Sequence, residues 1–199
     1  TELPSVDDPV EILDGIVAKR REMLQGMKGN SKVDVDSFDE LIEPKLFTMS
    51  LSGEATLYPR LGEMFAEIRR RGAVSFLVTN GLNPSALRKL EAGGLPTQLV
   101  ISCNAPNEDL FLRWHRSSVE GVWKKFLESL DVMRSLEGKV RRVVRLTLVK
   151  EGEEGEFGGV MNMSEENIWE YCELIRRAAP DFVHVKGYKA VGYAKERMG

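Results

Sequence analysis

The chain has 199 residues, 42% of them hydrophobic, which is enough for one substantial core and a single domain over residues 1–199. Its net charge of −3 excludes a generally basic nucleic-acid-binding protein but leaves room for RNA held by a local patch. Two cysteines, Cys103 and Cys172, are too few for a disulfide framework and too far apart for a metal knuckle, so the cytoplasm is the expected compartment. No apolar run reaches membrane-spanning length.

The first half of the chain alternates helical and strand patterns. Asp7-Asp8-Pro9 is a helix start signal. The apolar residues that share one face of the helix after it are Val10, Leu13, Ile16, Val17, Leu24 and Met27. A connecting segment over 28–45 contains a short helix around Phe38 and Leu41. There follow a strand at 46–51, a helix with Leu61, Met64, Phe65 and Ile68 inward, a strand at 75–79 and a helix at 84–91.

The second half continues this alternation. A strand at 98–103 precedes a long amphipathic helix that carries Val119, Val122, Phe126, Leu130 and Met133, and a strand follows at 143–149. The acidic, glycine-rich loop at 151–163 has the composition of a solvated insertion. A helix at 164–178 begins at the cap-like Ser164 and buries Ile168, Tyr171, Cys172 and Ile175, before a strand at 182–186. His115, beside Arg113 and Arg116, is interpreted as polar loop surface.

Five strands separated by helices predict an α/β protein with a parallel sheet. The strands are rich in aliphatic and β-branched residues, as is typical of parallel strands buried on both faces. The chain starts on a helix and stops just after a strand. We therefore expect one further strand before Pro9 and a closing helix after Gly199.

Polar side chains gather at the predicted carboxyl ends of the strands, where α/β sheets place their chemistry. These residues are Ser52-Gly53-Glu54, Thr79-Asn80-Gly81, Ser102-Cys103-Asn104, Lys150 and Lys186-Gly187-Tyr188. A glycine lets the backbone approach a ligand, and the neighbouring Glu54 supplies a carboxylate for an ammonium group. The set suits a small ligand that carries both an amine and a carboxylate, although Gly53-Glu54 alone also fits an ordinary turn.

Arg145 and Thr147 lie two residues apart in one strand, so they point to the same face of the sheet. If that face is the interior of a barrel, a buried Arg145 needs an anionic partner. This favours a bound carboxylate or phosphate.

Five segments in register resemble the radical SAM domain of the tRNA 4-demethylwyosine synthase family. They are SLSGEATLYP (50–59), FLVTNG (76–81), PTQL (96–99), RLTLVK (145–150) and PDFVHVKGY (180–188). The resemblance implies a partial parallel (β/α)6 barrel that lacks its first strand and its closing helix. It also implies a radical SAM carbon–carbon lyase that condenses N1-methylguanosine 37 of tRNA-Phe with pyruvate to form 4-demethylwyosine, in the wybutosine pathway.

The resemblance also implies cofactors, partners and site residues. The cofactors are S-adenosylmethionine and a [4Fe-4S] cluster, with FMN in a separate flavodoxin-like domain as a possible electron donor; a monomer without membrane attachment is expected. Gly53 and Glu54, with Ser52, are implied to receive the methionine amino group. Thr79, Asn80, Ser102 and Asn104 are implied to contact its carboxylate and ribose. Lys186, Lys150 and Arg145 are candidates for engaging pyruvate, as a Schiff base or a salt bridge.

Two departures from the family pattern limit these expectations. The Cys-x3-Cys-x2-Cys motif that holds the cluster is absent and is expected upstream of Thr1, so the chain alone should be inactive. Asn104 stands where the family usually has an aspartate. Three alternatives stay open: another radical SAM enzyme, a non-catalytic remnant that binds S-adenosylmethionine or RNA, and an aldolase-like barrel that uses Lys186.

Overall fold

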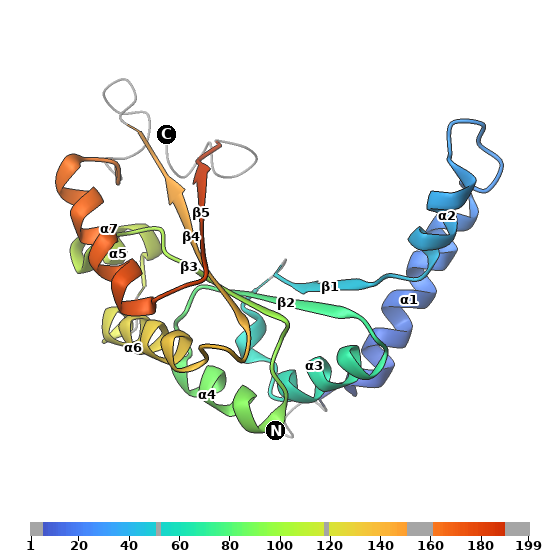
Figure 1. Ribbon diagram of the computed structural model, residues 1–199, viewed down its shortest axis with the longest axis horizontal. Coiled ribbons are helices and arrows are strands. Elements are labelled where there is room, and N and C mark those ends of the chain that lie inside the picture. Colours follow the sequence, from blue (N-terminus) through green and yellow to red (C-terminus); the bar gives the residue numbers. More distant parts are fainter. Residues whose placement is uncertain (1–5, 51–52, 118–119, 151–160, 190–199) are drawn as a thin grey trace.

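The computed structural model describes residues 6–50, 53–117, 120–150 and 161–189, except for the side chains of residues 35–37 and 39. Its centre is one parallel sheet in which each strand pairs with the strand before it, in the order β1-β2-β3-β4-β5 (Figure 1). The strands are β1 (Leu46–Met49), β2 (Val74–Thr79), β3 (Gln98–Ser102), β4 (Arg141–Leu148) and β5 (Phe182–Gly187). All five predicted strands and their parallel pairing are confirmed.

Helices separate the strands along the chain, as predicted. They are α1 (Pro9–Gln25), α2 (Val35–Ile42), the 3-10 turn η1 (Ala55–Leu57), α3 (Leu61–Arg70), α4 (Pro84–Gly93), α5 (Glu108–His115), α6 (Val122–Ser135) and α7 (Glu165–Ala178). Side-chain caps begin several of them: Asp8, Asn83 and Ser164 each accept a hydrogen bond from a backbone N–H of the first turn.

The helices bury one face of the sheet. Alternate strand residues, among them Phe47, Leu77, Ile101 and Leu146, join the helices in a single hydrophobic core. We call the opposite face, to which no helix of the described residues contributes core contacts, the open face. Arg145 and Thr147 both belong to the open face, which confirms the prediction that they share a side.

Two predictions about burial are wrong, and a third element is less buried than its pattern suggests. All of β5 is exposed, because β5 is an edge strand and none of the described helices covers its Val183 and Val185. Ile168 is 53% exposed because α7 packs through Tyr171 and Leu174 instead. On α1, Pro9 and Leu13 are buried, whereas Val10 and Ile16 of the predicted apolar face are exposed, because much of α1 extends past the edge of the sheet (Figure 1).

The region before α6 also differs from prediction. Residues 108–115 form a separate helix, α5, capped by Asn107, whose side chain accepts from the backbone of Leu110. His115 is therefore not loop surface: it ends α5, half-buried, with its ring 4.2 Å from that of Phe111. Burial lowers the pKa of His115. Val119, predicted on the same long helix as Val122, lies outside the described residues.

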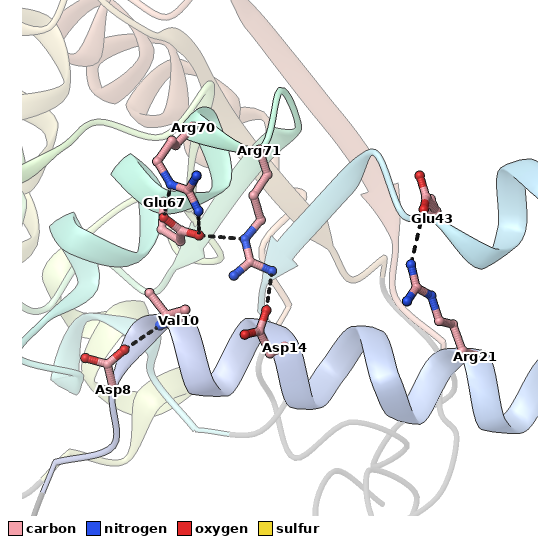
Figure 2. Close-up of polar contacts among 8 residues, drawn as sticks. All are labelled: Asp8, Val10, Asp14, Arg21, Glu43, Glu67, Arg70 and Arg71. Carbon is pink, nitrogen blue, oxygen red and sulfur yellow. Dashed lines mark hydrogen bonds and ion pairs between the residues drawn. The ribbon is translucent and has the colours of Figure 1, made fainter.

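Ion pairs connect α1 to the C-terminal end of α3 (Figure 2). Arg71, just after α3, contacts Asp14 of α1 at 2.8 Å and Glu67 at 2.7 Å. Arg70 contacts the same Glu67 carboxylate at 2.7 Å, and the Glu67 side chain is only 10% exposed. The two guanidinium groups, first that of Arg70 and then that of Arg71, lower the pKa of Glu67 to about 2.

No helix of the described residues is long and apolar enough to span a membrane.

The Glu67 cluster predicts a specific acid sensitivity. The folded pKa of Glu67 is below its unfolded value, so its contribution to stability is present near neutrality and is lost as pH falls from about 4.5 towards 2. Glu67→Gln should therefore be less stable than the parent at pH 6, and the difference should shrink below pH 4. Urea unfolding over this pH range measures the difference in the free energy of unfolding between the variant and the parent.

Glu173→Gln, which breaks an exposed ion pair with Arg176 at the same i,i+3 spacing as Glu67 and Arg70, is the control and should have a smaller effect. An equal effect of the two variants at pH 6 would contradict the prediction.

Candidate functional site

The turn after β1 holds Glu54 in a defined position. Gly53 has φ of 82°, a left-handed conformation that favours glycine, and the space where a side chain would stand is open. Glu54 then caps η1: its Oε1 accepts from the backbone N–H of Thr56 at 3.2 Å and from the Thr56 hydroxyl at 2.9 Å. Ser52, which was predicted to belong to this site, lies outside the described residues.

The end of β2 supplies further donors to the same carboxylate. The Thr79 hydroxyl donates to Glu54 Oε1 at 2.6 Å, and the backbone N–H of Asn80 donates to Oε2 at 2.9 Å. The structure thus brings together three residues that the sequence predicted as one site. We call Glu54, Thr56, Thr79 and Asn80 the Glu54 cluster.

The two oxygens of Glu54 are not equivalent. Oε1 accepts from three donors within the cluster, whereas Oε2 accepts from one. Since a carboxylate oxygen has two lone pairs, Oε2 keeps capacity for another donor. Gly53 and Glu54, with Thr48 and Met49, also line a cavity of about 370 Å³. The arrangement can accept a hydrogen bond from a ligand's ammonium group.

A second group forms between β3 and β4. Arg145 Nη2 donates to the Ser102 hydroxyl at 2.8 Å, and both residues belong to the open face. Arg145 is half-buried, its Nε is buried without a hydrogen-bond partner, and in the described part of the chain it forms no ion pair. A guanidinium group in this state is suited to an anion such as a carboxylate or a phosphate.

Asn162 is a site residue that the sequence analysis missed, because it was assigned to the solvated loop. Its side chain is buried and makes three hydrogen bonds: it accepts from Val149 N–H at 2.7 Å and donates to the backbone oxygens of Asn104 (2.7 Å) and Thr147 (2.8 Å). Its hydrogen bonds therefore connect the carboxyl end of β3 to that of β4. Asn104 Oδ1 is buried and has no hydrogen-bond partner among the described residues, so it remains a free acceptor next to the carbonyl that Asn162 binds.

The two candidate lysines, Lys186 and Lys150, are exposed and lie outside the groups described so far. Lys186 lies on the open face, in register with Thr147. It is two residues along β5 from His184, which pairs with Arg145. Lys150 follows β4 and is exposed, as is Lys186. Neither is part of the Glu54 cluster.

Within the described ranges, no group of three His, Cys, Asp or Glu residues could hold a metal ion. Cys103 is fully buried, and burial raises the pKa of its thiol to about 12, which disfavours the thiolate that a cluster requires. The described residues therefore do not fit an iron–sulfur cluster.

Comparison with known proteins shows what this chain resembles. It is 40% identical over 200 residues to the S-adenosyl-L-methionine-dependent tRNA 4-demethylwyosine synthase of Pyrococcus abyssi, and 35% identical over 182 residues to that of Schizosaccharomyces pombe. These matches cover 100% and 92% of this chain but 55% and 24% of the relatives, so the chain spans about half of the archaeal protein. No family model matches the chain.

Solved structures give the same result. A TYW1 structure with a lysine–pyruvate adduct bound matches all of this chain and 60% of its own, with a TM-score of 0.78 and 30% identity. The crystal structure of an archaeal TYW1 matches 94% of this chain and 59% of its own, with a TM-score of 0.75 and 29% identity. The resemblance found from the sequence motifs is confirmed.

The buried position of Asn162 leads to a prediction about stability. Asn162→Ala would leave three backbone groups at the ends of β3 and β4 without their partner, at a cost of roughly 2–4 kcal/mol in the free energy of unfolding. Urea unfolding measures this cost. Asn30→Ala, which removes an exposed side-chain bond to Lys32 N–H, is the control and should cost well under half as much. Equal losses for the two variants would contradict the role given to Asn162.

Proposed function

We propose that this chain, a homologue of the tRNA 4-demethylwyosine synthases, supplies the S-adenosylmethionine-binding part of an enzyme that builds 4-demethylwyosine on tRNA-Phe. The substrates would be N1-methylguanosine 37 and pyruvate. The observation that carries the proposal is that the same sheet holds two complementary groups, Glu54 in the turn after β1 and Arg145 in β4. Glu54 keeps an acceptor for an amine, and Arg145 keeps a donor for an anion.

These groups fit the amino-acid part of S-adenosylmethionine. Glu54 Oε2 would accept from its ammonium group, and Gly53, which has no side chain, would let the ligand approach the backbone. Ser102 and Asn104, beside Arg145, would hold its carboxylate or ribose. When bound, S-adenosylmethionine supplies the family's hydrogen-abstracting radical chemistry. The [4Fe-4S] cluster would need ligands outside the described residues, so we assign these residues no part in that step.

Pyruvate is proposed from the related TYW1 structure that carries a lysine–pyruvate adduct. On this chain, Lys186 is the better placed of the two candidate lysines because it shares the open face with Arg145. A Schiff base would need an amine in a desolvated place, whereas Lys186 and Lys150 are exposed. We therefore propose a salt bridge from Lys186 to the pyruvate carboxylate, with Lys150 as the second candidate.

Other parts of the proposal concern the whole protein. The open sheet would be part of a (β/α)6 barrel, since its strands pair in sequential order and its helices bury one face. A carbon–carbon lyase activity, a flavodoxin-like electron donor with FMN, a monomeric state and a cytoplasmic location complete the proposal.

Replacing Glu54 tests the cofactor site. In the full-length protein, Glu54→Gln should raise the KM for S-adenosylmethionine about tenfold or more, since a hydrogen bond to a charged group contributes roughly 1.5–3 kcal/mol. The measurement is 4-demethylwyosine formed from methylated tRNA-Phe and pyruvate under anaerobic conditions. Glu91→Gln, an exposed surface change, is the control. Parental KM and turnover for Glu54→Gln would refute the assignment of this site.

Replacing Lys186 tests the pyruvate assignment separately. Lys186→Ala in the full-length protein should lower kcat/KM for pyruvate roughly 10-fold by loss of an ionic hydrogen bond. The KM for S-adenosylmethionine should be unchanged. Lys150→Ala is the matched comparison, since both lysines are exposed. A larger loss for Lys150→Ala would transfer the role to Lys150, and parental values for both would exclude these two lysines.

A further inference from the structure

The hydroxyl of Thr79 makes both its donor and an acceptor hydrogen bond inside the protein. It donates to Glu54 Oε1 at 2.6 Å and accepts from the backbone N–H of Gly81 at 3.1 Å. Only 2% of the residue is exposed. A hydroxyl has a single hydrogen to donate, so Thr79 offers no donor to a ligand in this state.

Thr56 also donates hydrogen bonds to Glu54 Oε1. It is 4% exposed, and it donates to Glu54 Oε1 from its hydroxyl and from its backbone N–H. The backbone of Thr56 is in turn held by Asn83, whose side-chain amide donates to the Thr56 carbonyl at 3.0 Å. Two buried threonines from different parts of the chain therefore converge on one atom.

The position of a carboxylate is otherwise poorly defined. The last torsion of a glutamate side chain is broad and roughly two-fold, so an unsupported Glu54 could present either oxygen over a range of angles. Donors on Oε1, together with Asn80 N–H on Oε2, remove that freedom. Groups held in place before a ligand arrives bind it without the cost of ordering them.

We propose that Thr79 and Thr56 are positioning residues, which fix Glu54 so that Oε2 alone receives the ammonium group of the cofactor. The inference rests on the proposed function of Glu54 and deepens it. It replaces the direct contact to the cofactor that the family resemblance implied for Thr79 with an action through Glu54.

The test uses the full-length protein, purified anaerobically, with S-adenosylmethionine as the ligand and calorimetry as the measurement. Thr79→Val removes the hydroxyl at nearly constant volume and should raise Kd about tenfold, while Thr79→Ser should bind within about twofold of the parent. In a Glu54→Gln background, Thr79→Val should cause little further loss, because the two residues act as one unit. An analogue that lacks the amino group should bind Thr79→Val and the parent equally.

A matched control separates this role from general damage. Thr97→Val removes a threonine hydroxyl that accepts from Ser75 N–H near the other end of β2, and it should leave Kd unchanged. Thermal unfolding of each variant checks folding. If Thr79→Val does not fold, Thr56→Val takes its place with the same expected pattern.

Three results would overturn the inference: a parental Kd for Thr79→Val, the same loss with and without Glu54, or an equal loss with the analogue that lacks the amine. A parental Kd for Glu54→Gln would instead overturn the proposed site itself. The two failures are distinguishable: failure of the inference appears in the Thr79→Val measurements, whereas failure of the proposed site appears in the Glu54→Gln single variant.

Discussion

The hydrogen bonds between Glu54 and the end of β2 are the interaction on which the candidate site depends. Parallel strands place their carboxyl ends at one edge, but this does not set the positions of the side chains beyond them. Here, one carboxylate collects donors from its own turn and from the neighbouring strand, at 2.6 to 3.2 Å. The turn after β1 and the turn after β2 therefore act as one unit.

Asn162 has a comparable role on the neighbouring pair of strands. Its amide links backbone atoms of β4 to the segment that follows β3, beside Arg145 and Ser102. In both places a polar side chain, half-buried for Glu54 and buried for Asn162, satisfies groups at strand ends that the regular ladder leaves unpaired. The edge of the sheet is thus organised by polar contacts, while the apolar core lies on the helical face.

Much of the fold could be predicted from the sequence because the local patterns are strong. Runs such as 74–79 and 98–102 are rich in aliphatic and β-branched residues, and caps such as Ser164 mark helix starts. Burial was harder to predict, since the exposure of Ile16 and Val185 depends on which elements lie over them and not on their spacing. Asn162 was missed for a similar reason: no local pattern shows that a side chain in a polar loop will reach three backbone atoms in distant segments. Glu54, Thr79 and Asn80 could be predicted to lie close together because β1 and β2 are parallel neighbours, and the hydrogen bonds of Glu54 then join them; their role in binding a cofactor stays a prediction.

The sequential order of the strands has a consequence for how the chain acquires its structure. Each strand pairs with the strand that precedes it, so every new pairing closes only one strand–helix–strand loop. As the chain leaves the ribosome, β2 can join β1 before β3 has been made, and the later strands can join in turn. The Glu54 cluster, which needs only the segment up to Asn80, can therefore form before the part of the chain that carries Arg145 and Lys186 has been synthesised.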